Sequence, residues 1–108
     1  MPETSERANA RLIRARLMVG KAAAARLIPL YAPADRPEDR LDELAGGVAA
    51  ALPLSVVLLG MGEDMHVASI FPGAAGLQAA LQGEAPVAAL RAPGLPEARV
   101  TLTAPVLR

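Results

Sequence analysis

The stretch Leu54–Gly73, LSVVLLGMGEDMHVASIFPG, joins an apolar run to a loop that carries the only histidine of the chain. Its first part, Leu54–Gly60, is a continuous β-rich run, which is typical of a strand buried on both faces of a parallel sheet. The loop after it is therefore expected at the carboxyl end of a strand. In open α/β sheets ligands bind outside these ends, so the stretch predicts both the layering of the fold and the position of a site.

The segments on either side alternate between helical and extended patterns. Apolar spacing and the positions of Gly and Pro predict helices over residues 4–17, 38–52 and 74–82, and strands over residues 25–31, 86–92 and 99–103. The first helix is expected to open at Thr4 or Ser5, and Pro105 to end the last strand or to open another helix. The alternation predicts an α/β fold with a mostly parallel sheet and flanking helices.

Composition limits the classes of protein to consider. The 108 residues allow one domain, residues 1–108, and a hydrophobic fraction of 53% with only 2% aromatic residues predicts a thin core of Ala, Leu and Val. The 11 basic and 11 acidic residues balance, so no global field favours nucleic acid or an anionic membrane as a partner. No apolar run approaches the ~20 residues of a membrane span, and no secretory signal is recognised. A cytoplasmic protein is expected.

The absence of cysteine excludes disulfides, thiolate metal sites and thiol catalysis, and one histidine makes a structural zinc site improbable. The remaining candidate chemistry belongs to the loop. Imidazole can accept a proton from water near neutral pH, so His66 is a candidate general base that Asp64 could orient. Gly60 and Gly62 allow close backbone approach. A lone loop histidine is more often structural, and neither a dinucleotide-binding glycine pattern nor a P-loop is present.

The segment VVLLGMGEDMHVASIFPG resembles the signature of the 6-phosphogluconolactonases, in the glucosamine-6-phosphate isomerase/deaminase superfamily. An apolar strand, the two glycines, the aspartate, the histidine and Ala-Ser-Ile-Phe-Pro-Gly match its pattern. SERANARLIRARLM and PEARVTLTAPVL resemble the flanking segments of this family, so the similarity extends over nearly the whole chain. It implies a partial Rossmann-like, sugar-phosphate isomerase-like domain.

The resemblance implies hydrolysis of 6-phospho-D-glucono-1,5-lactone to 6-phosphogluconate in the pentose phosphate pathway, without metal or organic cofactor. His66 would deprotonate the attacking water, and Asp64 would position the imidazole or a sugar hydroxyl. Amides between Gly60 and Gly62 would face the substrate or the developing oxyanion. Arg99, and after it Arg91, would bind the phosphate. The expected partner is the small phosphorylated lactone, and the sequence leaves the oligomeric state open.

Two departures from the family pattern bear on activity. Met65 stands where the family has glycine, which would strain the loop if the position requires positive φ. The family domain is also longer and includes a glycine-rich phosphate-binding loop that is not recognised in this chain, so an incomplete domain is expected. The alternative is therefore a catalytically silent remnant that acts only by packing against a partner. The related deaminases have a glutamate at the position of Phe71, which favours the lactonase branch.

A further hypothesis concerns the first predicted helix. Arg7, Arg11 and Arg14 follow helical spacing and would share one face. Such a face is more often simply solvated, but it could also form a module that binds anions.

Overall fold

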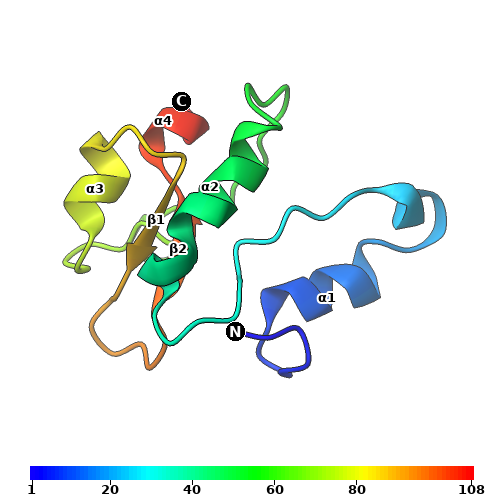
Figure 1. The fold of residues 1–108 in the computed structure, drawn as a ribbon, viewed down its shortest axis with the longest axis horizontal. Helices are drawn as coiled ribbons and strands as arrows, with labels where there is room; N and C mark the ends of the chain where they lie inside the picture. The colour runs from blue at the N-terminus through cyan, green and yellow to red at the C-terminus, as the bar shows by residue number, and fades with distance from the viewer.

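The computed structural model describes all residues, 1–108. Figure 1 shows a small sheet accompanied by helices, with α1 and the segment after it extending away from the rest. In chain order the elements are α1 (Asn9–Arg16), the 3₁₀ helices η1 (Gly20–Ala24) and η2 (Pro37–Arg40), α2 (Leu41–Ala49), α3 (Leu77–Gln82), β1 (Val87–Leu90), β2 (Arg99–Leu102) and α4 (Ala104–Leu107).

All three predicted helices are present, with shifted boundaries. α1 begins later than expected, because residues 2–8 form turns in which the Ser5 amide donates to the carbonyl of Pro2 (2.9 Å) and Ser5 Oγ accepts from the Arg7 amide (3.2 Å). Its N-cap is Ala8, and neither Thr4 nor Ser5 caps it. Pro105 lies in the first turn of α4, which confirms the prediction that it opens a helix.

The sheet contains β1 and β2 alone, and these strands are antiparallel, with Val87 opposite Leu102 and Leu90 opposite Arg99. The mostly parallel sheet predicted from the sequence is therefore wrong for these 108 residues, although the α/β class holds. The connection, residues 91–98, contains no helix. Parallel neighbours need a crossover of about a dozen residues or more, whereas a short loop returns the chain antiparallel.

Two predicted strands are extended but unpaired. Residues 25–31 and 54–60 make no ladder with another strand, so they are not strands in this structure. Side chains of the second segment are correspondingly exposed, with Val56 86% and Leu58 95% accessible. The reason is that a strand is stabilised by its neighbours, and the only paired strands of the chain, β1 and β2, hydrogen-bond to each other and not to this segment.

The core is thin, as the composition predicts, and comprises two clusters on opposite faces of β1. Ala88 and Leu90 pack with Ala80 of α3, whereas Val87 packs with Leu44 and Val48 of α2. Only 10 of the 108 residues are buried, so few apolar contacts fix the helices to the sheet. None of the helices has the length and apolar character that crossing a bilayer requires.

Candidate functional site

The Asp64–His66 pair is formed in a tight turn. The Met65 amide donates to the carbonyl of Gly62 (2.9 Å), and the Gly62 amide donates to the carbonyl of His66 (2.9 Å). Asp64 Oδ1 accepts a hydrogen bond from the His66 amide (3.2 Å) and also contacts Nδ1 of the imidazole. One carboxylate oxygen therefore contacts both the backbone amide and the ring of His66.

The electrostatics favour a proton on Nδ1. The hydrogen bond from the His66 side chain, followed by that from its backbone amide, lowers the pKa of Asp64, so this carboxylate stays charged at neutral pH. A charged acceptor at Nδ1 favours the tautomer with the proton on that nitrogen. No protein group hydrogen-bonds Nε2, and the His66 side chain is 22% accessible. The second nitrogen is thus available to a ligand or a water.

The two glycines before the pair differ in their steric role. A Cβ at Gly62 would overlap Cε1 of His66 and lie 2.5 Å from Nδ1, so the imidazole occupies the space that a side chain would need. A Cβ at Gly60 would meet nothing within 4 Å. The sequence predicts that both glycines allow another group to approach the backbone closely, but only Gly62 has such a neighbour. The amide of Gly62 is used within the turn, whereas that of Gly60 makes no backbone hydrogen bond.

Met65 adopts the backbone conformation that favours glycine. Its φ is 68°, in the left-handed region, and Ala68 follows with a φ of 51°. The condition under which a methionine is strained at this position is therefore met. The methionine nevertheless leaves Asp64 and His66 in contact, so the strain does not separate the pair.

Replacing Met65 with glycine is expected to stabilise the chain by up to about 1 kcal/mol, because the Cβ penalty at positive φ outweighs the extra backbone entropy of glycine. Urea unfolding at pH 7 measures the change. Met61→Gly is the matched control, since Met61 is comparably exposed (66% against 74%) but has no positive φ. This control should destabilise. Equal effects at the two positions would show that Met65 carries no strain.

The later half of the loop is anchored to β2. The Ser69 amide donates to Oγ1 of Thr101 (3.1 Å), and the Thr101 hydroxyl donates to the carbonyl of Leu102 (3.0 Å). Thr101 is only 2% accessible. The bond is made by the Ser69 backbone amide and not by its hydroxyl, and sequence reasoning missed the part played by Thr101. The only available signal was a small hydroxyl residue flanked by the apolar Val100 and Leu102.

Arg99 is brought close to His66 through Phe71. The imidazole and the Phe71 ring have centroids 4.2 Å apart at an interplanar angle of 39°, and Cζ of Arg99 lies 5.6 Å from the Phe71 centroid. Arg99 forms no ion pair with an acidic residue of the chain. Of the two arginines predicted to bind phosphate, Arg99 is the one whose guanidinium lies near the turn and has no carboxylate partner.

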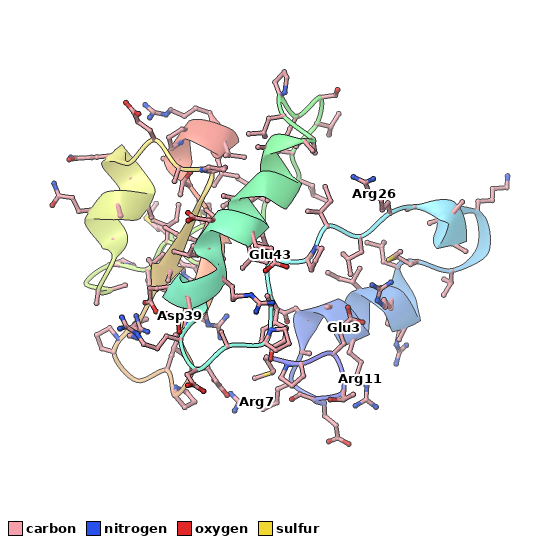
Figure 2. The ribbon with its side chains drawn as sticks, in the orientation of Figure 1. Glu3, Arg7, Arg11, Arg26, Asp39 and Glu43 are labelled. Atoms are coloured by element: carbon pink, nitrogen blue, oxygen red, sulfur yellow. The ribbon has the colours of Figure 1, made fainter.

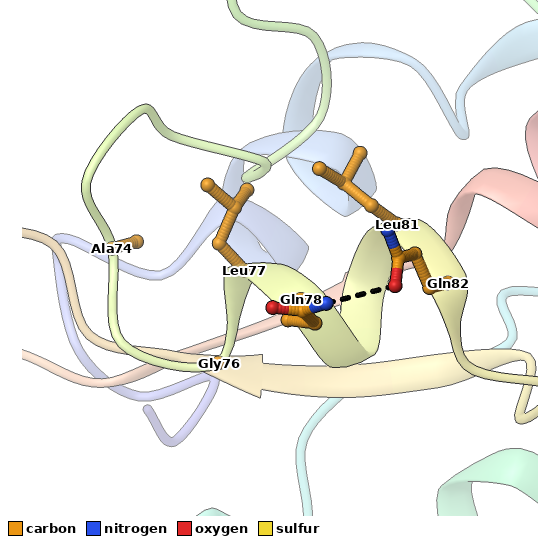
Figure 3. Close-up of a pocket in the computed structure, with 6 residues that line it drawn as sticks. All are labelled: Ala74, Gly76, Leu77, Gln78, Leu81 and Gln82. Atoms are coloured by element: carbon orange, nitrogen blue, oxygen red, sulfur yellow. Dashed lines mark hydrogen bonds between the residues drawn. The ribbon is translucent and has the colours of Figure 1, made fainter.

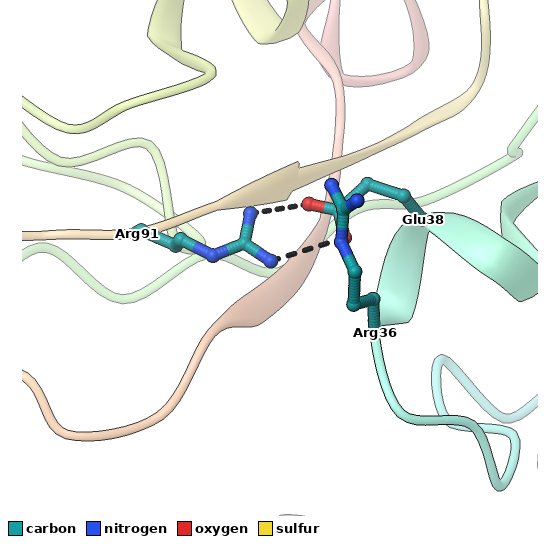
Figure 4. A network of polar contacts seen from close by, with 3 residues as sticks. All are labelled: Arg36, Glu38 and Arg91. Atoms are coloured by element: carbon teal, nitrogen blue, oxygen red, sulfur yellow. Dashed lines mark hydrogen bonds and ion pairs between the residues drawn. The ribbon is translucent and has the colours of Figure 1, made fainter.

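Arg91 forms an ion pair with an acidic residue outside the turn. Its guanidinium makes a two-pronged ion pair with Glu38, with Nη2 to Oε2 at 3.0 Å, and Arg36 approaches the same carboxylate at 3.5 Å (Figure 4). The pair joins η2 to the end of β1. It lowers the pKa of Glu38 to about 2, chiefly through the hydrogen bond from Arg91. The structure thus gives Arg91 a structural partner, so its predicted role in phosphate binding has little support.

This ion pair predicts an acid dependence of stability. Because the pKa of Glu38 is about 2 in the fold against an ordinary value of 4.5, its contribution to stability is present above pH 4.5 and is lost as pH falls towards 2. Solvent screens the pair, which is 30% and 47% accessible, so Glu38→Gln is expected to cost about 1 kcal/mol at pH 7. Unfolding of the original chain and the variant at both pH 7 and pH 3 should show that the difference between their free energies of unfolding is smaller at pH 3. Glu43→Gln, which breaks a pair with Arg40 within one turn, should cost about 0.3 kcal/mol.

The arginines of the N-terminal region are largely paired. Arg14 Nε donates to Glu3 (2.7 Å), Arg7 Nη2 donates to Glu97 (3.1 Å), and Arg11 reaches the carbonyl of Thr4 (3.3 Å). Figure 2 shows Glu3, Arg7 and Arg11 around α1. Carboxylates of the chain thus neutralise two of the three arginines, which weakens the hypothesis of an anion-binding helix.

The turn lies outside two hollows of the surface. One, of about 390 Å³, is shallow and is lined by α3 and the segment before it, including Gly76, Leu77 and Gln78 (Figure 3). The other, of about 230 Å³, lies among Leu30, Tyr31, Leu44 and Val100. Neither includes a residue of the Asp64–His66 pair.

Comparison with known proteins identifies what this arrangement resembles. The family described as glucosamine-6-phosphate isomerases/6-phosphogluconolactonase matches residues 1–108. The chain is 43% identical over 111 residues to a 6-phosphogluconolactonase of Pseudomonas aeruginosa, covering 99% of this chain and 46% of that protein. It is 42% identical over 107 residues to one of Rhizobium meliloti, covering 95% and 46%.

Comparison with a solved structure indicates the same family. The chain superposes on a 6-phosphogluconolactonase from Shewanella baltica with a TM-score of 0.92 and 30% identity, covering 99% of this chain and 46% of that one. This match confirms the predicted α/β, sugar-phosphate isomerase-like fold. The chain spans about half the length of the relatives that it matches.

Proposed function

The chain belongs to the glucosamine-6-phosphate isomerase/6-phosphogluconolactonase family, and from this premise we propose that its Gly60–Gly73 loop carries the water-activating site of a lactonase. The substrate is 6-phospho-D-glucono-1,5-lactone and the product is 6-phosphogluconate, in the pentose phosphate pathway. The observation that carries the proposal is the contact between Asp64 and Nδ1 of His66, which leaves Nε2 free. The compartment is the cytoplasm, since a phosphorylated sugar is charged and does not cross a membrane unaided.

His66 acts as the general base. Nε2 takes a proton from water while the water oxygen forms a bond to the lactone carbonyl carbon, which gives a tetrahedral alkoxide. When the carbonyl re-forms, the bond from this carbon to the ring oxygen breaks, and that oxygen takes the proton back from Nε2. Asp64 keeps its negative charge throughout and stabilises the imidazolium that exists between the two transfers.

Arg99 and the Gly60 amide supply the contacts with the substrate. Arg99 has no acidic partner in the chain and lies near the imidazole through Phe71, which suits a cation that holds the substrate phosphate. The Gly60 amide, free of backbone hydrogen bonds, is the better placed of the two glycine amides to contact the oxyanion. Arg91 has the weaker claim because Glu38 holds it.

Proton release tests the proposal. Opening of the lactone yields a carboxylic acid that ionises at pH 7, so a pH indicator follows turnover above the spontaneous rate. The purified 108-residue chain should accelerate the reaction, and His66→Ala should return it to the spontaneous rate. Equal acceleration by both proteins would remove His66 from the mechanism.

The same assay tests the second candidate function, a catalytically silent chain that acts only by packing against a partner. The exposed apolar side chains of Val56 and Leu58 favour that candidate, because such surfaces promote association. A chain that leaves the spontaneous rate unchanged, and that forms stable complexes with another polypeptide through residues 54–60, would support the packing role over catalysis.

A further inference from the structure

Phe71 occupies an unusual place for the only phenylalanine of an aromatic-poor chain. Its ring packs against the cluster of Ala74, Ala80, Ala88 and Leu90. The same ring also contacts the His66 imidazole, with centroids 4.2 Å apart, and the Arg99 guanidinium, with Cζ 5.6 Å from its centroid. One half-buried side chain thus links the core, the imidazole and the guanidinium.

We propose that Phe71 is a positioning residue that holds the imidazole of His66 and the guanidinium of Arg99 against one aromatic ring and so fixes the separation between them. The roles of the two groups, as water-activating base and phosphate-binding cation, rest on the proposed function. The positioning itself rests on geometry alone.

The first step of the argument concerns His66. Asp64 holds one edge of the imidazole through Nδ1, but a single hydrogen bond leaves the ring free to pivot about that contact. The Phe71 ring, tilted by 39°, restricts this motion through aromatic contact. Phe71 is itself fixed, because it packs on the core and follows Ser69, whose amide is bonded to the buried Thr101.

The second step concerns Arg99. It is the first residue of β2 and carries no ion pair, so an isolated arginine there would sample many rotamers. Contact with the Phe71 ring offers a cation–π interaction of about 0.5–1 kcal/mol at a partly exposed site, which favours one orientation. Because both groups contact one ring, their separation cannot exceed the sum of these two contacts.

The single histidine makes this inference directly measurable, since NMR of the full chain shows one set of imidazole ring signals. In the unsubstituted chain, the His66 ring protons should carry an upfield ring-current shift and show NOEs to the Phe71 ring. Phe71→Leu should abolish that shift, and Phe71→Tyr should retain it. The Arg99 side-chain protons should respond in the same way.

Leu77→Ala is the matched control for loss of core packing, because Leu77 packs against the same cluster but has no aromatic ring to hold the imidazole. It should lower stability but leave the imidazole signals in place. Where the chain catalyses hydrolysis, Phe71→Leu should lower kcat/KM about 10-fold and Phe71→Tyr should restore it, whereas Leu77→Ala should change it less than 2-fold.

The outcomes separate the two ideas. Imidazole signals that are unchanged in Phe71→Leu, or absent NOEs in the unsubstituted chain, would overturn the positioning role even if hydrolysis is observed. Signals that move as expected, in a chain that leaves the lactone untouched, would support the positioning role and contradict the proposed function. Should Phe71→Leu fail to fold, the NOEs and the Phe71→Tyr spectrum decide the question.

Discussion

Gly62→Ala is expected to lower lactone hydrolysis at least 100-fold and to displace the imidazole of His66 from Asp64. The reason is steric, because the methyl group would overlap Cε1 of His66 and lie 2.5 Å from Nδ1. Either the ring swings away or the turn opens, and each removes the base from its acceptor. General bases contribute about 10²–10⁴-fold, so losing the placement of His66 should cost a factor of this order. Steady-state kinetics by proton release gives the magnitude.

Gly60→Ala is the control, since the same methyl group would meet nothing within 4 Å. Neither glycine has positive φ, and Gly60→Ala keeps the main-chain amide that is proposed to contact the oxyanion, so only Gly62→Ala introduces a clash with the imidazole. The control should retain activity within about 3-fold. Comparable losses in the two variants would mean that both positions serve the substrate directly, and that crowding against His66 is not the cause.

The elements that the sequence predicted well are those that local pattern decides. The apolar spacing of Leu41, Leu44 and Val48 is sufficient to define α2, and the turn residues around Arg99–Leu102 define β2. The separation of Asp64 and His66 by one residue made their contact predictable, because a short turn keeps such side chains together.

Pairing between strands was not predictable in this way. The Leu54–Gly60 run has the composition of a buried strand, yet it is exposed, because burial depends on neighbours that the local pattern does not contain. The antiparallel pairing of β1 with β2 depends on a connection too short for a crossover, and the mostly parallel prediction gave this length too little weight.

The long-range contacts of the candidate site were equally beyond local reasoning. The Arg91–Glu38 pair joins residues 53 positions apart, and the bond from Ser69 to Thr101 spans 32. The spacing of these residues along the sequence does not predict that they are in contact. The sequence already ranked Arg99 ahead of Arg91 as a phosphate ligand. The structure adds the physical difference between them, because a carboxylate holds the Arg91 guanidinium whereas that of Arg99 rests on an aromatic ring.

Asp64→Asn is expected to reduce kcat about 100-fold while leaving the fold intact. The hydrogen bond from His66 lowers the pKa of Asp64, so the carboxylate is charged across the neutral range and favours the proton on Nδ1. An asparagine amide is neutral and can turn its NH₂ group towards Nδ1, which would favour the tautomer with the proton on Nε2. That tautomer cannot accept a proton from water at Nε2. The ¹⁵N shifts of the single histidine report the tautomer directly.

Glu63→Gln is the control for charge, because it removes an adjacent exposed carboxylate that makes no hydrogen bond to His66. It should leave the tautomer and the rate within about 2-fold of the original. If Asp64 acted only as a distant negative charge, both variants would slow the reaction similarly and neither would alter the ¹⁵N shifts. A tautomer change confined to Asp64→Asn, with a parallel fall in kcat, would instead show that the contact at Nδ1 prepares Nε2 for proton transfer.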